Sequence, residues 1–178
     1  MSMASPIEQE GKWRLTGEAH AERLRAALVA QGAVFQGVDE ELNRLFDRDG
    51  ELRARSQVLR LRTFAGQSRA VLTWKGKARR NGKLKSRAEQ EVGVDDAGTV
   101  MAILAGIGFA ETMVYPKTRE NWLLGGAAVS IDRLPFGLFC EIEGDLPEIA
   151  RVADLLGLTD AHAERRGYPA LMRAFLKR

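Results

Sequence analysis

The stretch IEQEGKWRL, residues 7–15, decides the fold. Its side chains alternate, with Ile7, Trp13 and Leu15 on one side of an extended chain and charged residues on the other. This pattern predicts a strand with one buried face. The other face carries two carboxylates followed by two cations, which are Glu8, Glu10, Lys12 and Arg14. On a single strand, a charged face of this kind is typical of a sheet surface turned towards water. The pattern of the other strands is needed to judge whether these charges have another role.

Length and composition favour one domain with a substantial core. The chain has 178 residues, too few for two ordinary domains, so we expect a single domain over residues 1–178. The formal net charge is only +3, from 27 basic and 24 acidic side chains. Where the charges lie therefore matters more than their sum. The many acids, and the lack of a row of aromatic residues that could stack on bases, argue against a nucleic acid as partner.

The cysteine content and the hydropathy of the chain predict its cellular compartment. The single cysteine, Cys140, excludes an internal disulfide framework and fits a reducing compartment, where we expect it as a buried core thiol. The first ten residues contain no apolar run, and no apolar stretch is long enough to span a membrane. We therefore expect a cytoplasmic protein, monomeric or homodimeric, with no membrane partner.

Most of the chain is predicted to be antiparallel sheet. Periodicity predicts helices over 18–31, 96–107, 147–156 and 168–177, with Gly32, Gly108 and Gly157 beyond the ends of the first three. The segments between them favour strands of roughly five to nine residues. Pairs of turn residues predict hairpins at Asp49-Gly50, Asn81-Gly82 and Gly125-Gly126. The expected fold class is α+β.

Charged residues recur in rows of one sign on the predicted strands. These rows are Glu8 and Glu10, Arg60 and Arg62, Lys75 and Lys77, Glu89 and Glu91, Lys117 and Arg119, and Glu141 and Glu143, with Asp132 alone on its strand. The opposite faces are apolar and should form one core covered by the helices, with Trp13, Leu59, Leu61, Leu72, Trp74, Val92, Trp122, Ile131 and Ile142.

The charged rows predict a ligand of mixed charge. Like charges two residues apart repel each other, and a counter-ion of the opposite sign would offset that repulsion. A closed sheet with these rows in its lumen would hold cations and anions together. A polyphosphate with a divalent metal supplies both. In this interpretation Glu8 and Glu10 face a metal, and Lys12 faces the neighbouring phosphate.

With these residues in place, the sequence resembles the CYTH family, also called triphosphate tunnel metalloenzymes. The family motif E-x-E-x-K matches Glu8, Glu10 and Lys12. Further elements follow in the family's order as far as residue 143, namely Arg60 and Arg62 in LRLR, Lys75 in LTWKG, Arg87, Glu89 and Glu91 in R-x-E-x-E, Lys117 and Arg119 in K-x-R, Asp132, and Glu141 and Glu143 in EIE.

The resemblance implies a fold and a set of roles. The fold would be a closed eight-stranded antiparallel barrel, or tunnel, with helices packed outside. Glu8, Glu10, Glu141 and Glu143 would bind Mg²⁺ or Mn²⁺, Asp132 would do so directly or through another ligand, and Glu89 and Glu91 would complete a second metal site or orient basic residues. The triphosphate would be bound by Lys12, Arg60, Arg62, Lys75, Lys117, Arg119 and Arg87. Carboxylates suit these metals, and arginine forks suit phosphate.

The expected activity is divalent-metal-dependent hydrolysis of a triphosphate: inorganic tripolyphosphate, a nucleoside triphosphate or thiamine triphosphate. Lys75 and Lys85 are the candidate catalytic lysines. Lys85 lies in the basic loop RRNGKLKSR, residues 79–87, which is either a solvated hairpin tip or a mobile lid over the substrate. Two other functions remain open. One is cyclisation of ATP by a class IV type adenylyl cyclase, and the other is a non-catalytic barrel that binds polyphosphate. The segment RGYPALM, residues 166–172, is either structural or packs at the tunnel mouth.

Overall fold

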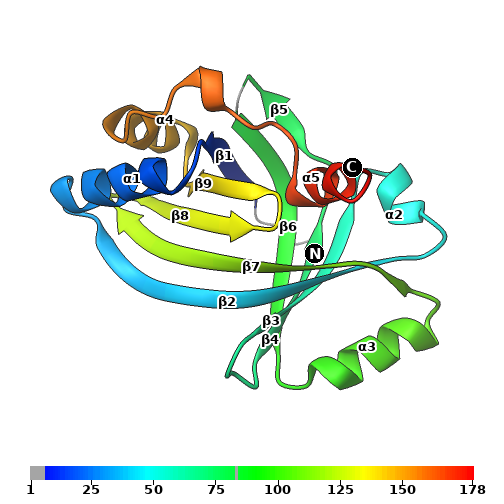
Figure 1. The fold of residues 1–178 in the computed structure, drawn as a ribbon. Coiled ribbons are helices and arrows are strands. Elements are labelled where there is room, and N and C mark those ends of the chain that lie inside the picture. Colours follow the sequence, from blue (N-terminus) through cyan, green and yellow to red (C-terminus); the bar gives the residue numbers. More distant parts are fainter. Residues whose placement is uncertain (1–6, 83) are drawn as a thin grey trace, which may run out of the picture. The chain divides into compact units, whose positions relative to one another are not determined.

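The computed structural model describes residues 7–82 and 84–178, without the side chains of Arg80 and Asn81. Figure 1 labels the elements along the chain. The strands are β1 (Ile7–Leu15), β2 (Val34–Asp47), β3 (Val58–Phe64), β4 (Ala70–Lys75), β5 (Arg79–Asn81), β6 (Leu84–Val94), β7 (Ala110–Leu124), β8 (Ala127–Leu134) and β9 (Gly137–Glu143). The helices are α1 (Glu18–Ala30), α2 (Glu51–Ala54), α3 (Ala97–Gly106), α4 (Leu146–Leu155), the 3₁₀ turn η1 (Asp160–His162) and α5 (Tyr168–Phe175). None of the helices in these described ranges has the length and apolar character to cross a membrane.

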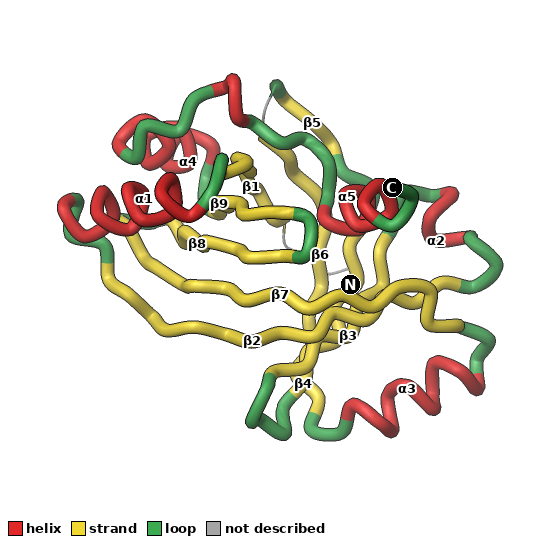
Figure 2. The backbone as a smooth tube through the Cα atoms, in the orientation of Figure 1, coloured by secondary structure: helices red, strands yellow, loops and turns green. Residues whose placement is uncertain are grey.

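The strands form one sheet that closes on itself. Their order is β1-β9-β8-β7-β2-β3-β4-β6-β5, and β1 also pairs with β6. Eight strands therefore form a closed antiparallel barrel, with β5 attached to β6 beyond the ring. This confirms the predicted fold class. Strands dominate the chain (Figure 2). Helices α1, α2 and α3 lie in connections between strands, whereas α4, η1 and α5 follow the last strand.

Two compact units divide the described residues. The first, which we call the α3 unit, comprises residues 7–8, 40–79 and 87–116. The second, the α1 unit, comprises residues 9–39, 80–86 and 117–178. Each has a hydrophobic cluster of its own. The expectation of a single domain stays a prediction.

The core of the α1 unit lies between its strands and two helices. Trp13 and Ile142 are fully buried on β1 and β9, and Leu28 of α1 and Ile149 of α4 pack in the same cluster. These apolar residues have the strand parity opposite to that of the charged rows, as the sequence predicts. Gly11 makes room for the Trp13 ring, because a Cβ at residue 11 would lie 2.4 Å from a ring carbon. Cys140 is buried in this core, as expected.

The α3 unit has a smaller core. Leu61 is fully buried there and packs with Leu104 of α3, and Leu72 lies against the same cluster. The prediction that Val92 belongs to the core is wrong, since its side chain is 55% exposed. Strand parity fixes the face on which Val92 lies, but burial also needs a covering element. The hydrophobic cluster around α3 includes Val94 but not Val92.

The predicted helix ends agree with the structure to within about two residues. Gly32 and Gly108, the stops expected for the first two helices, have φ values of +75° and +86°, the left-handed region that glycine reaches at little cost. The carboxylate of Asp96 accepts a hydrogen bond from the backbone of Thr99 and so caps α3, and Asp145 caps α4 in the same way.

Three expectations about the strands are wrong. First, β2, β6 and β7 contain 14, 11 and 15 residues, which is longer than the roughly five to nine predicted from turn residues. Gly37 and Pro116 lie inside these strands and do not end them. Second, β4 ends at Lys75, so Lys77 lies beyond it and does not extend a charged row.

The third error concerns Asp49-Gly50, which begins the short helix α2 and is not a two-residue hairpin. The Asp47 carboxylate accepts hydrogen bonds from the backbone N–H groups of Leu52 and Arg53, at 2.9 and 3.1 Å. These bonds satisfy donors of the first helical turn, and so they stabilise a helix where a tight turn was expected.

We predict that Leu28→Ala lowers the free energy of unfolding by about 2–5 kcal/mol, because it leaves a cavity in the core of the α1 unit. Val29→Ala is the matched control on the same helix: Val29 is 64% exposed, and the change should stay within about 0.5 kcal/mol. Urea unfolding of both variants measures this difference. Equal losses would show that α1 is not packed as described.

Candidate functional site

A cluster of charges in the α1 unit follows from the pairing of neighbouring strands. Arg119 of β7 lies directly opposite Asp132 of β8, and Lys12 of β1 lies directly opposite Glu141 of β9. The Arg119 guanidinium donates to both Asp132 oxygens, at 2.7 and 2.6 Å, and to Glu141 at 2.5 Å. Lys12 Nζ is 3.1 Å from Glu141. We call these four residues, with Lys117 and Tyr168, the Asp132 cluster.

Tyr168 of α5 completes this cluster. Its hydroxyl donates a 2.7 Å hydrogen bond to Asp132, and the Lys12 ammonium lies 3.8 Å from the centre of its ring. Lys12 also donates to the backbone carbonyl of Arg166. The sequence analysis did not place Tyr168 in a site, because strand parity says nothing about a residue at the start of a helix. Residues 166–172 therefore contact charged side chains of the strands, and their place at a tunnel mouth stays a prediction.

Burial and charge act in opposite directions on the pKa values of this cluster. Burial alone would raise the pKa of Glu141, but the positive charges of Lys12, Arg119 and Lys117 hold it well below its usual range. Burial and the neighbouring carboxylates raise the pKa of Tyr168 well above its ordinary value. Glu141 is therefore a carboxylate and Tyr168 a proton donor at neutral pH.

Two glutamates face each other beside this cluster. Glu10 of β1 and Glu143 of β9 are direct partners in the sheet, with carboxylate oxygens within 4.8 Å of each other. The ammonium group of Lys85 contacts Glu10. Two hard oxygen donors at this separation suit Mg²⁺ or Mn²⁺, which prefer carboxylate and water ligands. Glu8 lies two residues before Glu10 on the same face of β1.

The α3 unit carries a second charged cluster. Lys75 of β4 lies opposite Glu89 of β6, and its ammonium is 2.8 Å from Glu89 and 3.0 Å from Glu8. The guanidinium of Arg87 contacts Glu8 at 2.9 Å. Lys75 therefore lies between two carboxylates, one of which belongs to the opening motif of the sequence.

Arg60 and Arg62 lie on the same face of this unit. The Thr73 hydroxyl donates to Glu91 at 2.7 Å, and one Arg60 nitrogen approaches these two side chains at 3.3 and 3.4 Å. Within the described residues, Nε of Arg60 is buried without a hydrogen-bond partner. A buried cationic donor of this kind is costly unless an acceptor reaches it.

The sequence analysis missed two buried polar residues of β2. Glu41 lies 3.4 Å from Arg62, and Asn43 donates a hydrogen bond to Glu41 at 3.1 Å. Both belong to the segment ELNRL, residues 41–45, where they share one strand face. Arg44 and Leu45 break the alternation there, so the sequence pattern gives only a weak signal for this pair.

The pKa values of the neighbouring carboxyl groups of Glu8 and Glu89 are shifted in opposite directions. Burial, followed by the hydrogen bond to Glu8, raises the pKa of Glu89 to about 8. Burial would also raise the pKa of Glu8, but its hydrogen bond with Glu89 and the charges of Lys75 and Arg87 lower it far below its usual range. At neutral pH, Glu8 is therefore ionised and Glu89 mostly carries the proton.

The residues predicted from sequence thus fall into the two units. The α1 unit holds Glu10, Lys12, Lys85, Lys117, Arg119, Asp132, Glu141 and Glu143, and the α3 unit holds Glu8, Arg60, Arg62, Lys75, Arg87, Glu89 and Glu91. The sequence argument assigned the balancing charges to a bound ligand. The structure adds another source, because side chains of opposite sign on neighbouring strands already pair with them.

Several solved structures have a similar fold. The PH1819 protein of Pyrococcus horikoshii OT3 is 26% identical to this chain, with a TM-score of 0.77 over 96% of this chain and 99% of that one. A putative adenylate cyclase from Vibrio parahaemolyticus is 18% identical, with a TM-score of 0.80 over 95% and 99% of the two chains. A putative adenylyl cyclase from Hippeastrum, described as having a dominant triphosphatase activity, is 18% identical, with a TM-score of 0.72 over 94% and 96%.

The family is shown by sequence as well as by fold. The model of the CYTH domain matches residues 6–168, and this chain belongs to the CYTH domain family. Triphosphatases and putative adenylate cyclases both occur among its structural neighbours. No curated protein matches the chain.

The raised pKa of Glu89 gives a testable pH dependence. Above an ordinary glutamate pKa near 4.5, the unfolded chain releases the Glu89 proton, while the folded protein keeps it up to about pH 8. Folding stability contributed by this group therefore falls as the pH rises through that window. Glu89→Gln mimics the protonated form. We predict that the thermal midpoint of the variant increases relative to that of the wild type as the pH rises from 5 to 8.5. A constant difference across this range would contradict the assignment.

Proposed function

We propose that this protein is a divalent-metal-dependent triphosphatase that hydrolyses a triphosphate held against its charged strand faces. The observation that carries the proposal is the pair Glu10 and Glu143, two facing carboxylates beside strands lined with cations. Such a set of donors combines ligands for a metal with ligands for phosphate oxygens. Membership of the CYTH family supports this combination.

We assign the metal to carboxylates of β1 and β9. Glu8, Glu10, Glu141 and Glu143 would hold Mg²⁺ or Mn²⁺, since all four are oxygen donors on the charged faces of these strands. When bound, the metal supplies charge neutralisation at the phosphate oxygens and lowers the pKa of a coordinated water. The carboxylates fix where that charge lies.

The triphosphate would be bound by the basic residues that now pair with carboxylates. These are Lys12, Arg60, Arg62, Lys75, Arg87, Lys117 and Arg119. Phosphate oxygens can replace the carboxylates as acceptors at the same donors. The buried Nε of Arg60, without an acceptor among the described residues, supports this assignment most directly.

Three acids are better suited to orient cations than to bind metal. Both oxygens of Asp132 accept from Arg119, and one of them also accepts from Tyr168. Glu89 binds Lys75, and Glu91 binds Thr73 and Arg60. We therefore propose Asp132, Glu89 and Glu91 as positioning residues, which is one of the two roles left open for the last two.

Lys75 and Lys85 remain the candidate catalytic lysines. Lys75 lies between Glu8 and Glu89, and Lys85 contacts Glu10. Each ammonium group therefore adjoins one of the carboxylates that we propose as metal ligands, Glu8 or Glu10. An ammonium at this place would stabilise negative charge that develops on the phosphate oxygens during hydrolysis. Cyclisation of ATP would use the same phosphate and metal groups, with a ribose hydroxyl as nucleophile in place of water.

The activity test compares three substrates. Purified protein is incubated with tripolyphosphate, ATP or thiamine triphosphate, with Mg²⁺ or Mn²⁺, and phosphate and cyclic AMP are measured. We expect metal-dependent release of phosphate. Cyclic AMP as the main product would make the protein a cyclase, and saturable binding of all three substrates without turnover would make it a polyphosphate-binding barrel.

The double variant Glu8→Gln/Glu10→Gln tests the metal assignment. It preserves the shape of both side chains but removes two negative charges from the proposed site. We predict a loss of turnover on the order of 10²-fold or more, because the metal no longer balances charge on the phosphate. Binding of tripolyphosphate should persist, since all seven basic residues remain.

Glu22→Gln on α1, an exposed acid, is the control and should keep full activity. Phosphate release and calorimetric binding measure the two effects separately. Near-normal metal-dependent turnover in the double variant would mean that Glu8 and Glu10 do not bind the metal.

Arg60→Ala tests the phosphate assignment. It removes a cation whose contacts in the ligand-free protein are long, so we expect the thermal midpoint to change little while KM rises by about tenfold. Arg44→Ala is the matched control, because Arg44 pairs with Glu111 on the opposite face of β2. A large loss of stability with an unchanged KM would show that Arg60 is structural.

A further inference from the structure

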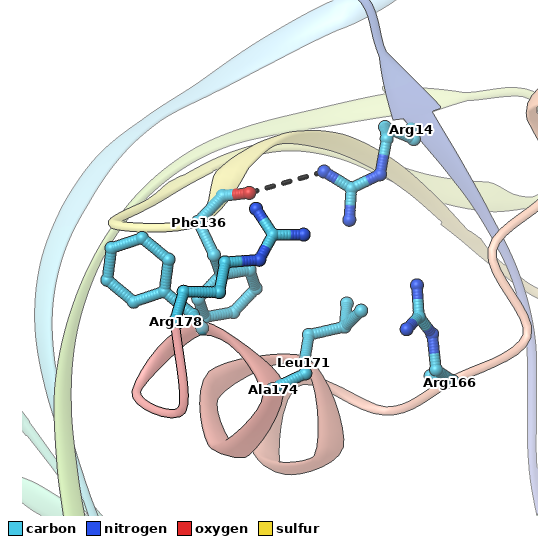
Figure 3. Close-up of a pocket in the computed structure, with 7 residues that line it drawn as sticks. Arg14, Phe136, Arg166, Leu171, Ala174 and Arg178 are labelled. Carbon is cyan, nitrogen blue, oxygen red and sulfur yellow. Dashed lines mark hydrogen bonds between the residues drawn. The ribbon is translucent and has the colours of Figure 1, made fainter.

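A pocket lies beside the Asp132 cluster but is lined by different side chains. Its volume is about 330 Å³, within the range of sites for small organic ligands. The lining residues come from β1, from the turn between β8 and β9, and from α5 with its flanking segments; they are Arg14, Phe136, Arg166, Leu171, Ala174, Phe175 and Arg178. Figure 3 shows the three guanidinium groups gathered around one open space above α5.

The charges of this pocket do not balance. Arg14 and Arg166 share one carboxylate, Glu164, at 3.6 and 2.8 Å. Hydrogen bonding from Arg166 lowers the pKa of Glu164 to about 2, so this group is ionised at neutral pH. The side chain of Arg178 has no hydrogen bond or ion pair among the residues that the structure describes. Three guanidinium groups thus line the pocket, and Glu164 pairs with two of them.

The geometry of Arg14 makes it a fixed donor. One of its terminal nitrogens donates to the carbonyl oxygen of Phe136 at 3.2 Å, and its guanidinium lies 4.5 Å from the centre of the Phe139 ring. These contacts hold the group in one plane. A planar guanidinium held in this way can present two parallel N–H donors to a phosphate group.

The other side of the pocket is apolar. Phe136 and Phe175 contribute aromatic rings whose centres are 6.4 Å apart, and Leu171 forms part of the wall towards α5. An inorganic anion would leave this surface unused, whereas a ligand with an aromatic ring would cover it. The lining therefore favours a molecule with an anionic end and a flat apolar end.

We propose that this pocket is a second ligand site, which binds a phosphate monoester carrying an aromatic ring. Arg14, Arg166 and Arg178 bind the phosphate dianion, and Phe136, Leu171 and Phe175 contact the ring. The site is separate from the metal-binding carboxylates and does not depend on the proposed hydrolysis. Its size and chemistry suit a nucleoside monophosphate, so AMP is the probe for the test.

The experiment measures AMP binding by titration calorimetry, without divalent metal, to four proteins. These are the wild type and the variants Arg14→Gln, Arg178→Ala and Arg173→Ala. Arg173 lies on α5 outside the pocket lining and makes the matched control for loss of a positive charge. Arg178 is exposed, so its variant stays informative even if Arg14→Gln impairs folding.

We expect saturable binding of AMP to the wild type, weakened about tenfold or more in Arg14→Gln and Arg178→Ala and less than about twofold in Arg173→Ala. Adenosine should not bind, and inorganic phosphate should bind more weakly than AMP. Equal affinity in the wild type and Arg178→Ala, or no binding at millimolar AMP, overturns the proposal. Phosphate binding as tightly as AMP overturns the assignment of the aromatic part.

Discussion

Ion pairs between directly opposed residues on neighbouring strands are the constraint on which the charged faces depend. Burying a lone charge is prohibitively costly, so each buried cation needs a carboxylate at a fixed place. The antiparallel register supplies that place: Lys12 is opposite Glu141, Arg119 is opposite Asp132, and Lys75 is opposite Glu89. A slip of one residue in any of these pairings would turn the charges towards the hydrophobic clusters.

The same pairing explains how the protein can keep these charges ready for a ligand. In the absence of other ions, each cation is partly neutralised by a carboxylate of the neighbouring strand. A triphosphate with its metal would give the cations a phosphate partner and the carboxylates a metal partner. Binding would therefore exchange one set of ion pairs for another and would not leave unpaired buried charges. The free energy of binding is then the difference between the free energies of two similar sets of interactions. Preorganisation by the sheet lowers the entropic cost of that exchange.

Much of the fold and site could be predicted because strand parity has a period of two. The rows through Glu8, Arg60 and Glu141 lie on the expected faces, and apolar residues such as Leu61 and Ile142 lie on the others. Tyr168 could not be found in this way, because its contact with Asp132 joins a helix to a strand. The long strands β2 and β7 were missed because single turn-forming residues within them do not end a ladder of hydrogen bonds held on both sides. Roles in metal or phosphate binding depend on ligands, and they stay predictions.

The contact of Lys12 with the backbone of Arg166 joins positions 154 residues apart. During synthesis β1 leaves the ribosome long before β9 and α5, so Lys12 has no native carboxylate or ring to meet until most of the chain has been made. Contacts of such long range are slow to form, and the closed sheet cannot be completed piecewise from one end. Until then β1 can pair with β6 but lacks its other neighbour, β9, and Trp13 lacks most of the core in which it is buried.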